Sequence, residues 1–147
     1  MREILFRGKW LGNGEWVEGY YCKISETTYA FAEDYERNPI PVHHYILQEV
    51  MTDWGLPNRF NQYEVDPETL CQYTELKDKN GNRIWENDIV RIENSMDEGI
   101  GNIEFYGGIW YVDGEPSNSL YDIVEYDDAD IEVIGNIFDN QEMMKEQ

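Results

Sequence analysis

Basic residues are scarce in this chain. Its 147 residues include eleven Lys and Arg against 31 Asp and Glu, which gives a formal net charge of −20. A surface of this sign repels phosphate groups, and the bases are not gathered into one segment. We therefore expect no direct binding to nucleic acid or to an anionic membrane. A partner attracted by charge is expected to be a basic protein.

Cysteine and long apolar runs are also scarce. Cys22 and Cys71 are the two cysteines and form no C-x-x-C pair, so neither a disulfide framework nor a metal cluster is indicated. We interpret them as two buried free thiols. No stretch of about 18 apolar residues occurs, and the first residues, "MREILFRGKW", carry charges where a signal peptide has its apolar run. These features predict a soluble, cytoplasmic protein.

The common catalytic and phosphate-binding motifs are missing. The sequence lacks G-x-S-x-G, G-x-G-x-x-G and G-x-x-x-x-G-K-[ST]. The segment "DKNGN" starts like a calcium loop, but Arg83 stands where that loop needs Gly and Ile89 where it needs Glu. We therefore predict no catalytic residue and no cofactor. A small enzyme remains an open alternative, with a site that folding would assemble from carboxylates dispersed along the sequence.

Two groups of residues are candidate metal ligands. His43 and His44 are adjacent, so on a strand their side chains point to opposite faces and could not share one ion. The acids Asp127, Asp128 and Asp130 could gather a divalent cation, but a solvated acidic loop is the favoured interpretation. We predict no metal site.

Alternation of apolar with polar residues is the main structural signal. Ile4, Phe6, Gly8 and Trp10 alternate with charges, and after the turn "LGNGE" the alternation resumes, which predicts a hairpin over residues 2–24. Further strands are expected at "TYAFA", "HHYILQEV", "YEV", "CQYTEL", "DIVRI", "GNIEFY", "IWYV" and "IEVIGNIF", and helical turns at "DPETL" and near Leu120.

These elements predict a mainly β fold with minor helix, in the β or α+β class. Short antiparallel strands would form a small bent barrel or sandwich, with the N-terminal β-hairpin packed on it. The strand at "IEVIGNIF" is expected to be buried on both faces. The length fits one domain over residues 1–147, either as one body or as two lobes of about 1–62 and 63–147.

The segment "LKDKNGNRIWENDIVRI", residues 76–92, holds four of the eleven bases in this acidic chain. Asn-Gly is the strongest short hairpin signal, preferred where both central residues need positive φ. We therefore expect Gly81 to have positive φ in a tight turn after Asn80, with the bases on the solvent side. The segment is interpreted as structural.

Family resemblance appears in "REILFR", "NGEWVEGYY", "VDPETLCQYTELKDKNGNRIWENDIVRI" and "EVIGNIFDN". The sequence resembles the YopX family of phage and prophage proteins, which implies a mostly β fold with no assigned activity, in a bacterial host or phage-infected cell. Its structural signature here consists of Tyr73, Asn80, Gly81, Asp88, Gly135 and Asn136.

Two positions depart from the pattern of this family, which usually has Gly where Glu75 and Asn87 stand. Asn tolerates a left-handed backbone, whereas Glu adopts it at a cost. A local change in the turn before Leu76 is therefore expected.

Besides the small enzyme, the sequence is compatible with two functions. One is a protein-binding accessory module, with a protein partner and with homo-oligomerisation left open. The alternative is an acidic DNA mimic that inhibits a basic DNA-handling host protein, although charge alone gives no geometry.

Overall fold

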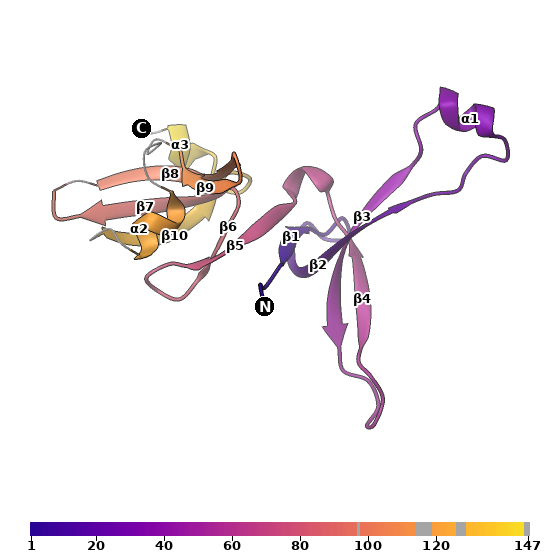
Figure 1. The fold of residues 1–147 in the computed structure, drawn as a ribbon, viewed down its shortest axis with the longest axis horizontal. Helices are drawn as coiled ribbons and strands as arrows, with labels where there is room; N and C mark the ends of the chain where they lie inside the picture. The colour runs from indigo at the N-terminus through magenta and orange to yellow at the C-terminus, as the bar shows by residue number, and fades with distance from the viewer. Residues whose placement is uncertain (97, 114–118, 126–128, 146–147) are drawn as a thin grey trace. The chain divides into compact units, whose positions relative to one another are not determined.

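The computed structural model describes residues 1–96, 98–113, 119–125 and 129–145 (Figure 1). Strands contain 52% of the residues and helices 13%, so the predicted mainly β class is confirmed. The chain divides into two compact units: unit 1 comprises Met1–Ile4 and Cys71–Gln147, and unit 2 comprises Leu5–Leu70. No helix among the described residues is long and apolar enough to cross a membrane.

Unit 2 is built on an antiparallel sheet in the order β4-β3-β2-β1. Its elements are β1 (Phe6–Lys9), β2 (Trp16–Ser25), α1 (Ala32–Arg37), β3 (Val42–Val50), β4 (Arg59–Glu64) and η1 (Pro67–Thr69). The predicted N-terminal hairpin is confirmed, because β1 pairs with β2 across the turn. Asp66 accepts a hydrogen bond from the Glu68 N–H at 3.0 Å and caps η1, as the sequence predicts.

Packing in unit 2 depends on close backbone approach. Ile46 and Val65 are almost fully buried. A Cβ at Gly8 would lie 3.0 Å from two atoms of the Val65 side chain, so glycine lets β1 lie against Val65. The strand expected at "TYAFA" is wrong: those residues lead into α1, which has acids in its first turn and Arg37 in its last, as the helix dipole favours. The strand expected at "YEV" begins earlier, at Arg59.

Unit 1 contains the β5–β6 hairpin and a four-stranded antiparallel sheet in the order β10-β7-β8-β9. Its elements are β5 (Cys71–Lys77), β6 (Arg83–Trp85), β7 (Asp88–Asn94), β8 (Glu98–Tyr106), β9 (Ile109–Val112), α2 (Leu120–Glu125), β10 (Ala129–Asn136) and α3 (Glu142–Lys145). In the described parts of the chain no sheet closes on itself, so the barrel form of the expectation is wrong.

The core of unit 1 joins β6 to β10 and α2, and Leu76 of β5 packs against it. Its buried members are Ile84, Val90, Ile103, Val112, Leu120, Ile123 and Ile131. The helical turn predicted near Leu120 is confirmed as α2, which packs both Leu120 and Ile123 into this core. The last strand is only partly as expected: Ile131 is buried, whereas Val133 and Ile134 are half-buried. A register shift between Val133 and Gly135 interrupts its alternation.

The turn at Asn80-Gly81 has a different form from the two-residue loop that Asn-Gly usually makes. Gly81 has φ +82, which confirms the predicted positive φ, but Asn80 is not among the positive-φ residues. The Gly81 N–H donates to the Asp78 carbonyl at 3.0 Å, so Lys79 and Asn80 are the central residues. This matches a three-residue hairpin loop closed by a left-handed glycine.

Glu75 and Asn87 both have left-handed backbones, with φ of 70 and 67. Glu75 therefore adopts a conformation that glycine adopts readily, and it does so at the cost expected for a residue with a side chain. Its side chain accepts a hydrogen bond from the exposed Arg2 Nε at 2.8 Å, which offsets little of that cost.

Glu75→Gly is expected to raise the free energy of unfolding by about 0.5–1 kcal/mol, because relief of left-handed strain exceeds the added entropy of the unfolded chain. Glu75→Ala keeps the strain and should change stability by less than about 0.5 kcal/mol. Urea titrations of both variants provide the measurement. Equal stability of the Gly and Ala variants would contradict the strain.

Gly81→Ala is expected to lower the free energy of unfolding by about 1 kcal/mol or more. A Cβ there would meet no atom within 4 Å, so the cost arises from the backbone alone. Lys77→Ala and Lys79→Ala, at exposed positions, should each change it by less than about 0.5 kcal/mol. Denaturant titrations provide the measurement. Lysine variants that are less stable than Gly81→Ala would refute the structural role of this turn.

Candidate interaction site

The six signature residues all lie in unit 1, where they hold turns and packing. They are Tyr73, Asn80, Gly81, Asp88, Gly135 and Asn136. Tyr73 is buried in β5, and its ring centroid lies 5.3 Å from that of Trp85. Asp88 is buried at the start of β7 and accepts a hydrogen bond from the Trp85 N–H at 2.8 Å. These contacts close the connection between β6 and β7.

Gly135 and Asn136 are the last two residues of β10, just before the turn at residues 137–139. A Cβ at Gly135 would lie 2.5 Å from Oδ1 of Asn140, so only glycine leaves room for that side chain. The Asn136 Oδ1 accepts from the N–H groups of Phe138 and Asp139 at 3.0 and 2.9 Å. Both residues therefore have a structural role, and the side-chain oxygen of Asn136 is used within the turn.

Asp78, which the signature omits, is the central polar group of the segment 76–92. Its carboxylate accepts hydrogen bonds from the N–H groups of Asn80 and Asn82 at 2.9 Å and of Val133 at 3.0 Å. Burial alone would raise the pKa of Asp78, but these backbone bonds, that of Val133 foremost, outweigh it and lower the pKa. The carboxylate thus holds the turn against β10, and its oxygens are occupied by amides.

The four bases of this segment have acidic or solvent surroundings. Lys77 and Lys79 are exposed, as expected. Arg83 and Arg91 are half-buried, with an Arg83 nitrogen 3.0 Å from the Glu3 carboxylate and the Arg91 Nε 3.1 Å from that of Glu98. The solvent-side expectation holds for the lysines, although Lys79 Nζ also lies 3.8 Å from the Glu132 carboxylate. The arginines are only half-exposed and lie beside carboxylates.

The two histidines lie next to each other on β3 and have separate partners. His43 Nδ1 bonds to the Glu64 carboxylate, and its Nε2 lies 3.2 Å from Oε1 of Glu26. His44 Nδ1 lies 2.7 Å from the Tyr21 hydroxyl. The bonds to Glu64 and then to Glu26 raise the pKa of His43. Both ring nitrogens of His43 therefore already have a carboxylate partner.

No group of three or more His, Cys, Asp or Glu able to hold a metal ion occurs among the described residues. Of the acidic cluster considered from sequence, Asp130 lies in β10, and Asp127 and Asp128 lie outside the described residues. Cys71 is fully buried and Cys22 half-buried, and both are free thiols, so the expectation of burial holds fully for Cys71.

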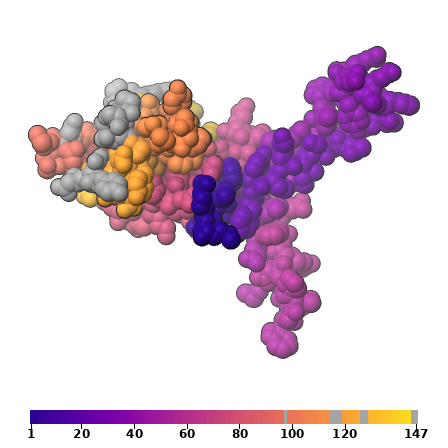
Figure 2. All heavy atoms as spheres, in the orientation of Figure 1, coloured from indigo at the N-terminus to yellow at the C-terminus, as the bar shows by residue number. Residues whose placement is uncertain are grey.

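The two most exposed large apolar side chains of unit 2 lie in the loop from β3 to β4, residues Met51–Asn58, here called the apolar loop. Met51 is 89% exposed, Trp54 101% and Leu56 62%. Figure 2 shows this end of the hairpin standing clear of the rest of unit 2. Burying such side chains is the main favourable term in association between proteins.

Hydrogen bonds fix the shape of the apolar loop. The Thr52 hydroxyl donates to the Pro57 carbonyl at 2.8 Å, and the Leu56 N–H donates to the Asp53 carbonyl at 3.1 Å. Gly55 has φ +85, a conformation that glycine adopts at little cost. The loop therefore holds Trp54 outward without needing a partner to order it.

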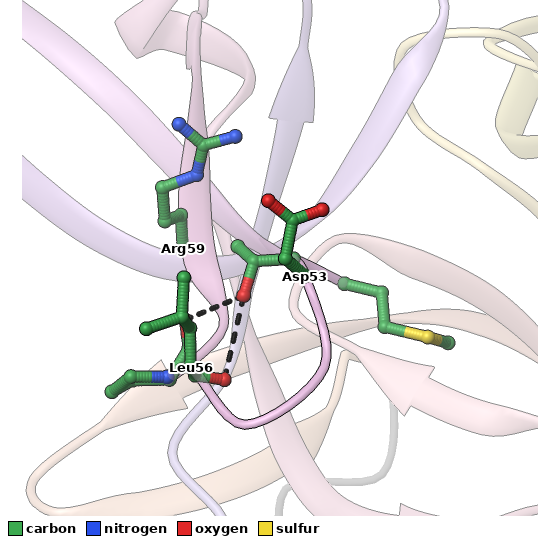
Figure 3. A pocket seen from close by; sticks show the side chains of 6 residues that line it. Asp53, Leu56 and Arg59 are labelled. Atoms are coloured by element: carbon green, nitrogen blue, oxygen red, sulfur yellow. Dashed lines mark hydrogen bonds between the residues drawn. The ribbon is translucent and has the colours of Figure 1, made fainter.

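The loop borders an open pocket of about 400 Å³. Figure 3 shows Asp53, Leu56 and Arg59 around it; Met51, Thr52 and Pro57 complete its lining. Its wall combines apolar side chains with one carboxylate and one guanidinium. The exposed part of this wall is more polar than apolar, and it offers no nucleophile with an activating base.

A second pocket, of about 330 Å³, lies in unit 1 beside the β8–β9 turn. Its lining includes Leu76, Ile109, Trp110 and Tyr121. Trp110 packs against the core of unit 1, so this surface also supports folding. The apolar loop is the stronger candidate, because its exposed side chains have no such task.

The sequence "MTDWGLPNRF" predicts a loop and by itself indicates no site. A signal was present: Met, Trp and Leu within six residues of a Gly- and Pro-containing loop, where polar residues are usual. The same residues could have been core, and their exposure is decided by the tertiary structure.

Comparison with known proteins settles the family. The profile of the family described as "YopX protein" matches residues 5–145. The chain belongs to the YopX family. Among solved structures, this YopX chain is similar to protein EF1440 from Enterococcus faecalis, with 20% identity, a TM-score of 0.58, and coverage of 97% of this chain and 98% of that one. At this identity the likeness shows the fold alone. No curated protein gave a significant match.

His43 of this YopX protein is expected to titrate above the ordinary pKa of histidine, because both ring nitrogens donate to carboxylates. A raised folded-state pKa stabilises the fold below the unfolded value of about 6.5, and this contribution is lost as pH rises through the folded value. An NMR titration of the His43 ring should show the rise, and Glu64→Gln should reduce it. An unchanged His43 titration in Glu64→Gln would contradict the assignment.

Proposed function

We propose that this YopX-family chain is a protein-binding accessory module of the phage and prophage type, and that the apolar loop is its contact site. The observation that carries this proposal is the full exposure of Trp54 on a loop that its own hydrogen bonds hold in place. Tryptophan is among the residues that contribute most to binding energy at protein interfaces. A pre-ordered loop loses little conformational entropy when it binds.

The partner proposed is a protein with an apolar pocket ringed by Lys and Arg. Trp54 would fill the pocket, while the net charge of −20 attracts a basic surround and speeds encounter. The same charge disfavours nucleic acid and anionic lipid as direct partners. No cofactor is needed for this role.

The test starts from a random peptide library selected on the immobilised protein, followed by titration of the selected peptides. Selected sequences should combine an apolar anchor with Lys or Arg. Trp54→Ala should weaken their binding by about 30-fold or more, equivalent to about 2 kcal/mol, because the main anchor is lost. Trp54 is fully exposed, so this variant should keep the thermal stability of the wild type.

Two methionines of nearly equal exposure provide a matched control. Met51→Ala, within the apolar loop at 89% exposure, should weaken binding, whereas Met96→Ala in unit 1, at 93%, should leave it unchanged. Equal binding of the peptides to the wild type and to Trp54→Ala would refute the proposed site.

A further inference from the structure

Strand β4 forms an edge of the sheet in unit 2, with β3 on one side. Residues Arg59, Phe60, Asn61 and Gln62 are all exposed. Proteins usually protect such an edge with a bulge, a proline or a charged side chain, because unpaired N–H and C=O groups invite another strand. Here the register with β3 runs without a shift from Val50↔Arg59 to Tyr45↔Glu64, and Phe60, Asn61 and Gln62 are neither charged nor proline.

The register shows which backbone groups face outward. The Val65 N–H donates to the His44 carbonyl at 2.9 Å, so Val65 faces β3. Backbone direction alternates along an antiparallel strand, which means that Tyr63 and Asn61 also face β3 and that Gln62 and Phe60 face away. The Glu64 carbonyl, which also faces away, accepts from the Leu11 N–H at 2.9 Å. The outward edge therefore offers the N–H and C=O groups of Phe60 and Gln62.

We propose that β4 pairs antiparallel with β4 of a second copy of this chain, with the two-fold axis at Asn61. Phe60 of each copy would exchange backbone hydrogen bonds with Gln62 of the other, and Arg59 would lie opposite Tyr63. Outward groups meet outward groups in this register, as an antiparallel ladder requires. The interface is isologous, so it closes as a dimer and does not extend into a fibre.

Electrostatic repulsion between two copies is smallest at this edge. A residue on a two-fold axis meets itself, and Asn61 is neutral and able to hydrogen-bond with its own kind. Unit 2 carries eleven carboxylates and five bases, a net charge of −6, whereas unit 1 carries twenty and six, a net charge of −14. Self-association through β4 thus uses the less repulsive unit and a strand segment without a carboxylate from Arg59 to Tyr63.

Disulfide trapping tests this register. In a Cys22→Ser background, Asn61→Cys places two thiols opposite each other in a non-hydrogen-bonded pair, where Cβ atoms lie about 4.5–5.5 Å apart. Such a pair is close enough to bridge after small adjustment. In this register Gln62→Cys lies opposite Phe60 of the second copy, so the two introduced thiols are too far apart to form a disulfide. Under mild oxidation we expect Asn61→Cys to cross-link at least about tenfold faster than Gln62→Cys and than the exposed Met96→Cys; equal rates would overturn the pairing.

Sedimentation of the wild-type protein gives a second measurement that separates this inference from the proposed function. The dimer fraction should rise with protein concentration and with salt, since salt screens repulsion between acidic copies, whereas binding to a basic partner should weaken with salt. Gln62→Pro removes an outward N–H without touching the β3 ladder and should abolish the dimer while the fold persists. Trp54→Ala should leave the dimer intact. A wild-type protein that stays monomeric at high concentration and high salt would refute the inference.

Discussion

The Asp78 carboxylate is the interaction on which the arrangement of unit 1 depends. It is buried, and it accepts backbone hydrogen bonds from its own turn and from Val133 on β10. The Lys79 N–H also donates to the Ile131 carbonyl at 3.0 Å, so the turn covers the outer edge of β10. An edge covered in this way cannot recruit a foreign strand. The basic segment of an acidic chain is thus explained by its turn and by its contacts with that edge.

The two units treat their strand edges differently. In unit 1 the turn around Asp78 satisfies backbone groups of β10. In unit 2 the exposed part of β4 has no such cover among the described residues, and its charges lie at its two ends, on Arg59 and Glu64. The chain therefore protects one edge with buried polar chemistry and leaves another available for pairing. Unit 2 also holds the apolar loop, which is next to β4 in sequence.

Much of the fold was predictable because it depends on local signals. Alternation identified the hairpin of β1 and β2, Asp66 and Pro67 marked the start of η1, and Asn80-Gly81 marked a turn. The type of that turn was not predictable, because the Asp78 side chain, not the dipeptide, sets which residues are central. Closure into a barrel could not be judged either, since it depends on contacts between strands that are distant in sequence.

The sequence by itself determined the sign of the charge, the mainly β class and the family, since composition, periodicity and motif are properties of the chain alone. Only the tertiary structure decided that Glu75 is held in a left-handed backbone, that His43 lies between two carboxylates and that Trp54 faces solvent. The reason is physical: burial and partnership arise when segments far apart in sequence meet, and no local pattern specifies which apolar residue will remain outside the core.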